Sequence, residues 1–184
     1  MMKFAYRLPL FIFLGLLALF LAYLVQSGGY GRHTLTQREA PHFQIHPLGE
    51  AAPVKSTSLR GKPHLVTFFA TWCHSCREEH GLLMALKSKN LLPIIGIAVR
   101  DDQAKVKAYL DKHGNPYTIV GLDENKELTG TWGVRGIPTA FLVDGQGVVR
   151  QVFRGVFNVA DVEEVLATLE ENAEDAGAST SPTH

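Results

Sequence analysis

The sequence predicts one α/β domain built on a mixed sheet with helices on both faces. Apolar runs of strand length, such as residues 92–99, alternate with segments whose apolar residues recur at helical spacing, which is typical of parallel β-α-β units. Near the C-terminus, two further apolar runs flank the turn residues 144–147, which indicates an antiparallel hairpin. The predicted order of elements is therefore β-α-β-α-β-(α)-β-β-α.

Each predicted element has its own signal in the sequence. An apolar run at residues 65–69 predicts the central strand, and leucines at helical spacing predict a helix over residues 77–87. The pair Asp101-Asp102 can cap the helix after the second strand. The other expected elements are an edge strand within 41–47, a loop at 49–58, a helix at 103–113, a strand at 117–122, a short helix at 124–132, strands at 140–143 and 148–153, and a last helix capped by Asn158.

The composition limits the size and the class of the protein. The chain has 184 residues, with 18 basic and 18 acidic side chains, and this balance gives no support for nucleic-acid binding. Once a membrane segment and two tails are set aside, about 130 residues remain, which suits one domain with a full core. The two cysteines lie in one motif, so the fold must be held by packing rather than by further disulfides.

The N-terminus predicts a membrane anchor. Residues 9–25 are uncharged and apolar apart from Tyr23, and 17 helical residues span about 26 Å, near the thickness of a bilayer core. A cleaved signal peptide and a buried core helix are the alternatives, but this stretch is long and has no polar face. The expected segments are a cytoplasmic tail at 1–7, an uncleaved anchor crossing the lipid bilayer at 8–26, a linker at 27–40, the folded domain at 41–172 and a disordered tail at 173–184.

The two cysteines lie where a strand ends and a helix begins. Cys73 follows the central apolar run, and Cys76 comes one helical turn later. The first amide groups of a helix have no intrahelical partners, and the helix dipole is positive at that end, so a thiolate there is stabilised. This position predicts dithiol–disulfide exchange, in which Cys73 attacks and Cys76 resolves the mixed disulfide.

Other uses of a C-x-x-C motif fit the sequence less well. A structural zinc site needs about four ligands, and the sequence has no second cysteine pair, although His74 and His80 are near. Covalent haem attachment needs a histidine where the chain has Arg77. A purely structural disulfide would close too short a loop to add much stability. We therefore expect no metal and no cofactor beyond the redox-active cysteine pair.

The motifs together resemble the thioredoxin superfamily, and more closely its CcmG/DsbE family. The general likeness is a strand, Trp72-Cys73-x-x-Cys76, a helix, and later Gly136-Ile137-Pro138 before a strand. The closer likeness rests on Ala70-Thr71-Trp72-Cys73, Cys76-Arg77-x-Glu79-His80, Asp101-Asp102, Gly114-Asn115-Pro116-Tyr117, and Gly133-Val134-x-Gly136-x-Pro138 with Phe141-Leu142-Val143-Asp144. The resemblance covers residues 62–157 and implies a thioredoxin-like sheet.

Members of this family are membrane-anchored periplasmic proteins of cytochrome c maturation. The resemblance implies that the protein reduces disulfides of apocytochrome c, so that the haem-attachment cysteines are free. It implies electrons from a membrane donor of the DsbD/CcdA kind, and a place in the bacterial inner membrane with the domain in the periplasm. A broader periplasmic reductase or oxidant is one alternative. A module that binds apocytochrome, with an incidental dithiol, is another.

The resemblance also assigns roles to individual residues. Cys73 would be the exposed nucleophile and Cys76 the resolving thiol. Pro138 would be a cis-proline that presents the backbone of Ile137 to an extended substrate segment, and an ordinary trans turn proline is the alternative. Glu79 would lie near the dithiol and carry its proton, unless it is a solvated helix residue.

Some positions leave alternatives open or depart from the family. Trp72 would shield the motif and contact substrate, with core packing as the alternative. Thr67 replaces the buried aspartate of thioredoxin itself, and Thr139 replaces the glutamate that commonly follows the cis-proline in this family. His74 between the cysteines would stabilise the thiolate and raise the reduction potential, or be an exposed bystander.

Overall fold

The computed structural model describes residues 8–27, 37–49 and 52–178. The chain divides into two units, Met1–Thr34 and Leu35–His184. In the first unit, α1 covers Leu8–Ser27. None of the helices in the described part of the chain combines the length and apolar character that a membrane span requires. The expected tail at 1–7 and most of the expected linker lie outside the described residues.

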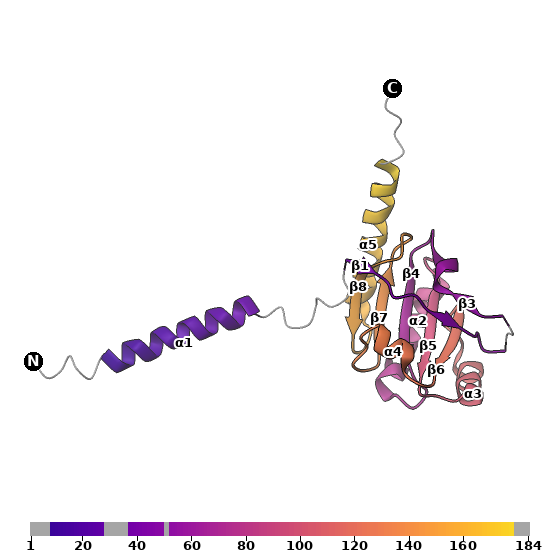
Figure 1. The fold of residues 1–184 in the computed structure, drawn as a ribbon, viewed down its shortest axis with the longest axis horizontal. Helices are drawn as coiled ribbons and strands as arrows, with labels where there is room; N and C mark the ends of the chain where they lie inside the picture. The colour runs from indigo at the N-terminus through magenta and orange to yellow at the C-terminus, as the bar shows by residue number, and fades with distance from the viewer. Residues whose placement is uncertain (1–7, 28–36, 50–51, 179–184) are drawn as a thin grey trace, which may run out of the picture. The chain divides into compact units, whose positions relative to one another are not determined.

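The second unit contains a mixed sheet of six strands in the order β1-β8-β7-β4-β5-β6 (Figure 1). The strand β4 pairs in parallel with β5, as β5 does with β6, whereas β7 is antiparallel to both β4 and β8. These strands are β1 (Arg38–Glu39), β4 (His64–Phe69), β5 (Ile94–Val99), β6 (Ile119–Asp123), β7 (Thr139–Val143) and β8 (Val148–Arg154). The predicted mixed sheet, with its parallel units first and its hairpin last, is confirmed.

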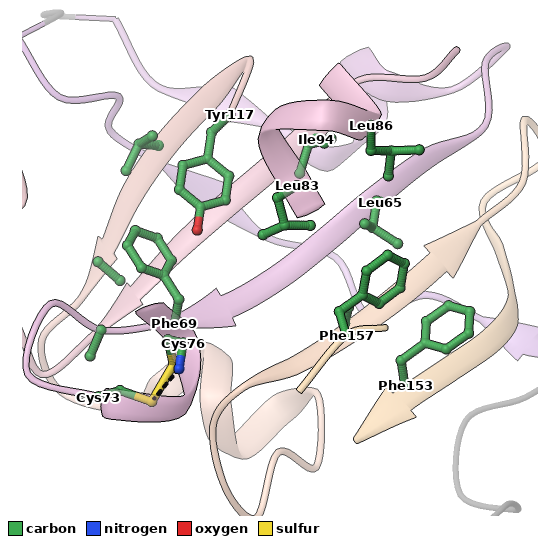
Figure 2. Packing of buried hydrophobic residues seen from close by; sticks show 14 of the residues in the cluster. Leu65, Phe69, Cys73, Cys76, Leu83, Leu86, Ile94, Tyr117, Phe153 and Phe157 are labelled. Atoms are coloured by element: carbon green, nitrogen blue, oxygen red, sulfur yellow. Dashed lines mark hydrogen bonds between the residues drawn. A yellow bond between two sulfur atoms is a disulfide. The ribbon is translucent and has the colours of Figure 1, made fainter. Parts of the chain in front are cut away.

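Three helices pack on one face of the sheet. They are α2 (His74–Ser88), α3 (Gln103–His113) and α5 (Val159–Ala178). All six residues of β4 are buried, and alternate side chains point to opposite faces. Leu65 and Phe69 of β4 share one buried cluster with Leu83 of α2 (Figure 2). Val106 of α3 and Val165 of α5 belong to the same cluster.

The opposite face is covered by short elements. They are the two-stranded sheet of β2 (Gln44–Ile45) with β3 (Val54–Lys55), the 3-10 helix η1 (Ser56–Leu59) and α4 (Glu127–Thr131). Val66 and Phe68 of β4 pack there in a second cluster with Phe43 and Trp132. The Trp132 ring lies 4.9 Å from that of Phe141, centroid to centroid. The prediction of helices on both faces is therefore confirmed.

A glycine brings an aromatic pair close to the end of the central strand. A Cβ atom at Gly96 would lie 2.7 Å from the Tyr117 ring, so only glycine leaves room for this ring against β5. Tyr117 in turn stacks on Phe69 with ring centroids 4.6 Å apart (Figure 2). Because Phe69 is the last residue of β4, this stack supports the chain just before the cysteine motif.

The N-terminal boundary of the domain, the expected loop at 49–58 and the end of the last helix differ from the sequence predictions. Arg38–Glu39 was expected in the linker but forms β1, whose pairing with β8 is flanked by a hydrogen bond from Gln37 N to Val149 O of 2.7 Å. The expected loop at 49–58 contains β3 and most of η1, and the expected edge strand is the short β2, paired with β3 outside the main sheet. The helix α5 continues to Ala178, inside the expected disordered tail, and residues 179–184 lie outside the described part. Two-residue strands are specified by their partners, so they leave no periodic pattern in the sequence.

Candidate active site: a covered disulfide at the carboxyl edge of the sheet

The cysteine pair lies just beyond the carboxyl end of β4, where α2 begins. Cys73 is the N-cap residue of α2 and has an extended backbone, so the helix begins at His74, three residues before the predicted start. Cys73 and Cys76 form a disulfide (Figure 2). The Cys73 sulfur accepts a hydrogen bond from the amide of Cys76 at 3.2 Å. This amide belongs to the first helical turn, whose donors stabilise negative charge on sulfur.

The expectation that Cys73 is exposed is wrong for this disulfide form. Cys73 is only 8% exposed and Cys76 6%, so accessibility hardly distinguishes the two. The carbonyl oxygen of Ile137, from the loop before β7, lies 3.9 Å from the Cys73 sulfur and helps to cover it. The chemical difference between the cysteines therefore comes from their position on α2, because only the Cys73 sulfur receives the amide of the first turn.

The loop that covers the disulfide contains a cis-proline. The Ile137–Pro138 peptide bond is cis, as the family resemblance implied, and the trans alternative is excluded. The carbonyl of Pro138 accepts a hydrogen bond from Gly155 N at 3.0 Å, and the Thr139 hydroxyl donates to Gly136 O at 2.8 Å. These bonds fix the loop from both sides and hold the Ile137 carbonyl over the sulfur.

Trp72 lies on the surface beside the motif. It is 58% exposed, so the alternative that it packs in the core is wrong. Its indole nitrogen donates a hydrogen bond to the Arg100 carbonyl at 3.2 Å. The ring is therefore held next to Cys73 while much of its surface stays open to a partner.

Glu79 is buried beneath the motif. Its residue is 3% exposed, so the alternative of a solvated helix residue is wrong. Burial raises the pKa of Glu79 to about 7; the amide of Phe157, which donates to Oε2 at 2.8 Å, opposes this rise, and the charge of Asp161 adds to it. Residues three apart lie on the same side of a helix, so Glu79 follows Cys76 along one side of α2. A carboxyl group with this pKa can gain or lose a proton near neutral pH.

Two residues that the sequence analysis did not place in the active site adjoin it. Burial raises the pKa of Tyr117 well above its ordinary value, and the nearby charge of Glu79 raises it further, so its hydroxyl stays protonated. Asp101 accepts hydrogen bonds from the backbone and hydroxyl of Thr71 rather than capping α3, which Asp102 does instead. The pair of adjacent aspartates could have indicated this role, because a helix needs only one N-cap residue and the other aspartate is then free to bind elsewhere.

His74 points away from the covered core. Its side chain is 83% exposed, and its Nε2 lies 3.3 Å from Glu78 Oε1, one helical turn further along α2. This exposure fits both alternatives for His74, a tuning residue and a bystander. Within the described parts of the chain, no group of three or more His, Cys, Asp or Glu side chains is placed to hold a metal ion.

Comparisons with known proteins agree with this geometry. The redoxin family model matches residues 36–166. The thiol:disulfide interchange protein DsbE of Vibrio cholerae is 34% identical over 170 residues, which cover 89% of this chain and 92% of that protein. The thiol:disulfide interchange protein HelX of Rhodobacter capsulatus is 40% identical over 114 residues, 61% of this chain and 64% of HelX.

A solved structure has a similar fold. The crystal structure of a thiol:disulfide interchange protein of the thioredoxin family from Chlorobium tepidum is 30% identical, with a TM-score of 0.59, and the match covers 74% of this chain and 97% of that one. Motif, fold and relatives therefore converge on one chemistry for the Cys73–Cys76 pair. The chain belongs to the redoxin family of thioredoxin-fold proteins, among relatives of the DsbE/HelX type, and is a thiol–disulfide oxidoreductase that uses a C-x-x-C motif.

Proposed function

We propose that this protein reduces disulfides of apocytochrome c in the bacterial periplasm during cytochrome c biogenesis. The observation that carries the proposal is the set of groups around Cys73. Its sulfur lies 3.2 Å from a first-turn amide and 3.9 Å from the Ile137 carbonyl, beside the exposed Trp72. The choice of apocytochrome c as substrate rests on the motifs shared with the CcmG/DsbE family.

The reaction begins with the reduced protein. The Cys73 thiolate attacks one sulfur of the substrate disulfide, and the other substrate sulfur leaves as a thiolate that takes up a proton. Cys76 then loses its proton and attacks the Cys73 sulfur of the mixed disulfide, which releases the second substrate thiol. The substrate gains two electrons and two protons, and Cys73–Cys76 becomes the disulfide. A membrane donor of the DsbD/CcdA kind would return the protein to its reduced form.

Glu79 is the proposed proton acceptor for Cys76. The pKa of about 7 means that a substantial fraction of Glu79 is ionised at neutral pH, and can take the proton that Cys76 gives up. Pro138 and Ile137 would bind substrate, because a substrate segment lying along this loop would meet the Ile137 backbone next to the reacting sulfur. Trp72 would add apolar contact from the other side.

A covalent trap tests the substrate assignment. The Cys76→Ser variant can attack a substrate but cannot resolve the mixed disulfide, so we expect apocytochrome c and a membrane donor to stay attached to Cys73. The Cys73→Ser variant is the matched control and should capture neither. A wide range of secreted disulfide proteins on Cys73 would favour the broader reductase or oxidant instead. If nothing is trapped and a Cys73→Ala strain still matures cytochrome c, the reductase proposal fails, and a module that binds apocytochrome c is the alternative that remains.

The exposed His74 is the one observation that favours an oxidant as the second candidate. A positive charge next to Cys73 stabilises the thiolate, and thus the reduced form, which raises the reduction potential. Equilibration with glutathione measures this potential directly. A value near that of thioredoxin, about −270 mV, is expected of a reductant, whereas a value near −120 mV would indicate an oxidant.

The membrane anchor is part of the proposal. Its support is the uncharged, apolar sequence of residues 8–26 and the helix α1 over Leu8–Ser27. We propose that this segment crosses the inner membrane once, with residues 1–7 in the cytoplasm and the domain in the periplasm. Alkaline extraction of membranes and protease treatment of spheroplasts test this arrangement. The full chain should remain in the membrane and its domain should be cleaved from outside, whereas a soluble or protected domain would contradict it.

A further inference from the structure

Asp101 joins the loop that precedes Cys73 to the end of the neighbouring strand. It lies two residues after β5, and both of its carboxylate oxygens accept hydrogen bonds. Oδ2 accepts from the Thr71 amide at 2.6 Å, and Oδ1 accepts from the Thr71 hydroxyl at 3.0 Å. Oδ1 also accepts from the amide of Asp102 at 2.9 Å. This carboxylate therefore accepts two hydrogen bonds from Thr71 of the catalytic loop and is itself held by the amide of the next residue, Asp102.

The anchoring segment is held in place on its other side as well. Arg100 has a left-handed backbone with φ of 49°, and its amide donates to the Asp123 carbonyl at the end of β6 at 3.1 Å. Its own carbonyl accepts the indole N–H of Trp72 at 3.2 Å. Two successive residues of the catalytic loop, Thr71 and Trp72, are thus tied to two successive residues after β5.

We propose that Asp101 is a positioning residue for thiol–disulfide exchange, which keeps the Cys73 sulfur at the N-terminus of α2. The loop from Thr71 to Cys73 is short, and its last amide already bonds back to Ala70 O at 3.2 Å. A rotation of Thr71 would therefore move Cys73 relative to the amide of Cys76, which lies 3.2 Å from its sulfur. Asp101 holds the one residue of this loop that has both a backbone and a side-chain donor turned towards it.

Asp101 could act as a brace, that is, by holding Thr71 through hydrogen bonds, or simply as a nearby negative charge. The two roles predict opposite changes in the pH at which the Cys73 thiolate forms. As a negative charge, Asp101 would disfavour the Cys73 thiolate, so its removal would make the thiolate form at lower pH. As a brace, Asp101 favours the thiolate indirectly, because it keeps the sulfur at the helix N-terminus, and its removal would make the thiolate form at higher pH. The direction of the change separates the two.

The variants Asp101→Asn and Thr71→Val test the brace in the full chain. Both carboxylate oxygens of Asp101 face backbone amides, so either orientation of an asparagine sets an NH2 group against an N–H donor. Thr71→Val removes only the hydroxyl bond and changes no charge. Asp102→Asn is the matched control, because it removes the same charge one residue further on, while an asparagine oxygen can still accept from the amides of Ala104 and Lys105.

The readouts are the pH profile of Cys73 alkylation in the reduced protein and the equilibrium with glutathione. We expect the alkylation midpoint to rise by about one pH unit in Asp101→Asn, a tenfold loss of thiolate, which is the size of one charge-assisted hydrogen bond. The glutathione equilibrium should move towards the disulfide by about the same factor, which corresponds to about 30 mV. Thr71→Val should move both quantities in the same direction by a smaller amount, and Asp102→Asn should leave them unchanged.

Three results would overturn the proposal. A fall of the alkylation midpoint in Asp101→Asn would show that Asp101 acts only as a charge. Unchanged values in both Asp101→Asn and Thr71→Val would show that the loop keeps its place without the brace. An equal shift in Asp102→Asn would assign the effect to general surface charge. If Asp101→Asn does not fold, the isosteric Thr71→Val decides alone, since a rise of its midpoint supports the brace and no change rejects it.

Discussion

Two buried carboxyl groups, Glu79 and Asp144, are covered to almost the same extent but have very different partners. Glu79 is 3% exposed and Asp144 is 4% exposed. Asp144 sits in the β7–β8 turn and accepts from the amides of Gln146 at 2.9 Å and Val148 at 2.8 Å, and from Arg150 Nε at 2.7 Å. Glu79 receives one backbone amide, that of Phe157.

This difference in hydrogen-bond partners gives the two carboxyl groups different surroundings at the same degree of burial. The three donors of Asp144 replace the water that its charge loses on burial, and one of them is itself charged. A single amide does not replace the hydration that a charged Glu79 loses on burial. The effect of burial is therefore larger than that of the hydrogen bond, and it raises the pKa of Glu79 to about 7. Burial alone therefore says little about the use of a carboxyl group, whereas the number and charge of its donors say much.

The largest effect is expected from Asp144→Ala. This change removes the acceptor of two turn amides and leaves the partly buried Arg150 without its ion pair, so the free energy of unfolding should fall by about 4 kcal/mol. Urea unfolding of the oxidised protein measures this value. Asp111→Ala is the control, because its exposed ion pair with Lys107 should contribute less than about 0.5 kcal/mol. A loss at Asp144 as small as that of the control would show that three donors are not needed to keep a carboxylate buried there.

The sequence revealed the parts of the site that depend on short-range order. The apolar run, the cysteine spacing and the helical leucines place Cys73 at the strand–helix junction, and the structure has this junction within three residues. These signals are local, because a strand, a turn and a helix each follow from neighbouring residues. The cis bond at Pro138 was implied only by the family resemblance, since nothing near it in the sequence distinguishes cis from trans.

The parts that the sequence did not reveal depend on distant partners. The cover over Cys73 comes from Ile137, 64 residues further along the chain, so no local pattern predicts it. The burial of Glu79 is equally hidden, because the adjacent Glu78 is exposed and both belong to one polar stretch of α2. The role of Asp101 depends on Thr71, 30 residues earlier. Such contacts are consequences of the fold and become visible only when the sheet is assembled.

A pH dependence is expected from Glu79, slightly smaller than the effect of Asp144→Ala. The pKa of Glu79 rises from an ordinary 4.5 to about 7 on folding, so between these pH values the folded protein holds a proton that the unfolded chain has lost. The free energy of unfolding should therefore fall as the pH rises from 4.5 to 7, by about 3 kcal/mol in total, and this stability stays lost above pH 7.

The variant Glu79→Gln should lack this fall, because glutamine does not titrate. Urea unfolding of the oxidised wild type and variant at pH 5 and pH 8 gives the comparison. Glu78→Gln serves as the control, since its side chain is 53% exposed and should leave the fall intact. If the free energy of unfolding of Glu79→Gln falls as much as that of the wild type, another group binds the proton. The difference in donors between Glu79 and Asp144 would then not explain the pH dependence.

The smallest effect is expected from Asp161→Asn, which tests how surroundings set the pKa of Glu79. Asp161 lies in the first turn of α5, and its charge is the weakest of the three influences on Glu79, after burial and the Phe157 amide. Because this charge raises the pKa of Glu79, its removal should lower that pKa slightly, a shift that added salt would reduce. Carbon NMR of the Glu79 carboxyl group follows the titration, and Glu163→Gln provides a charge control on the same helix. A larger fall than this would mean that charge rather than burial holds Glu79 near neutrality, so that Glu79 and Asp144 would differ in their charged neighbours more than in their number of donors.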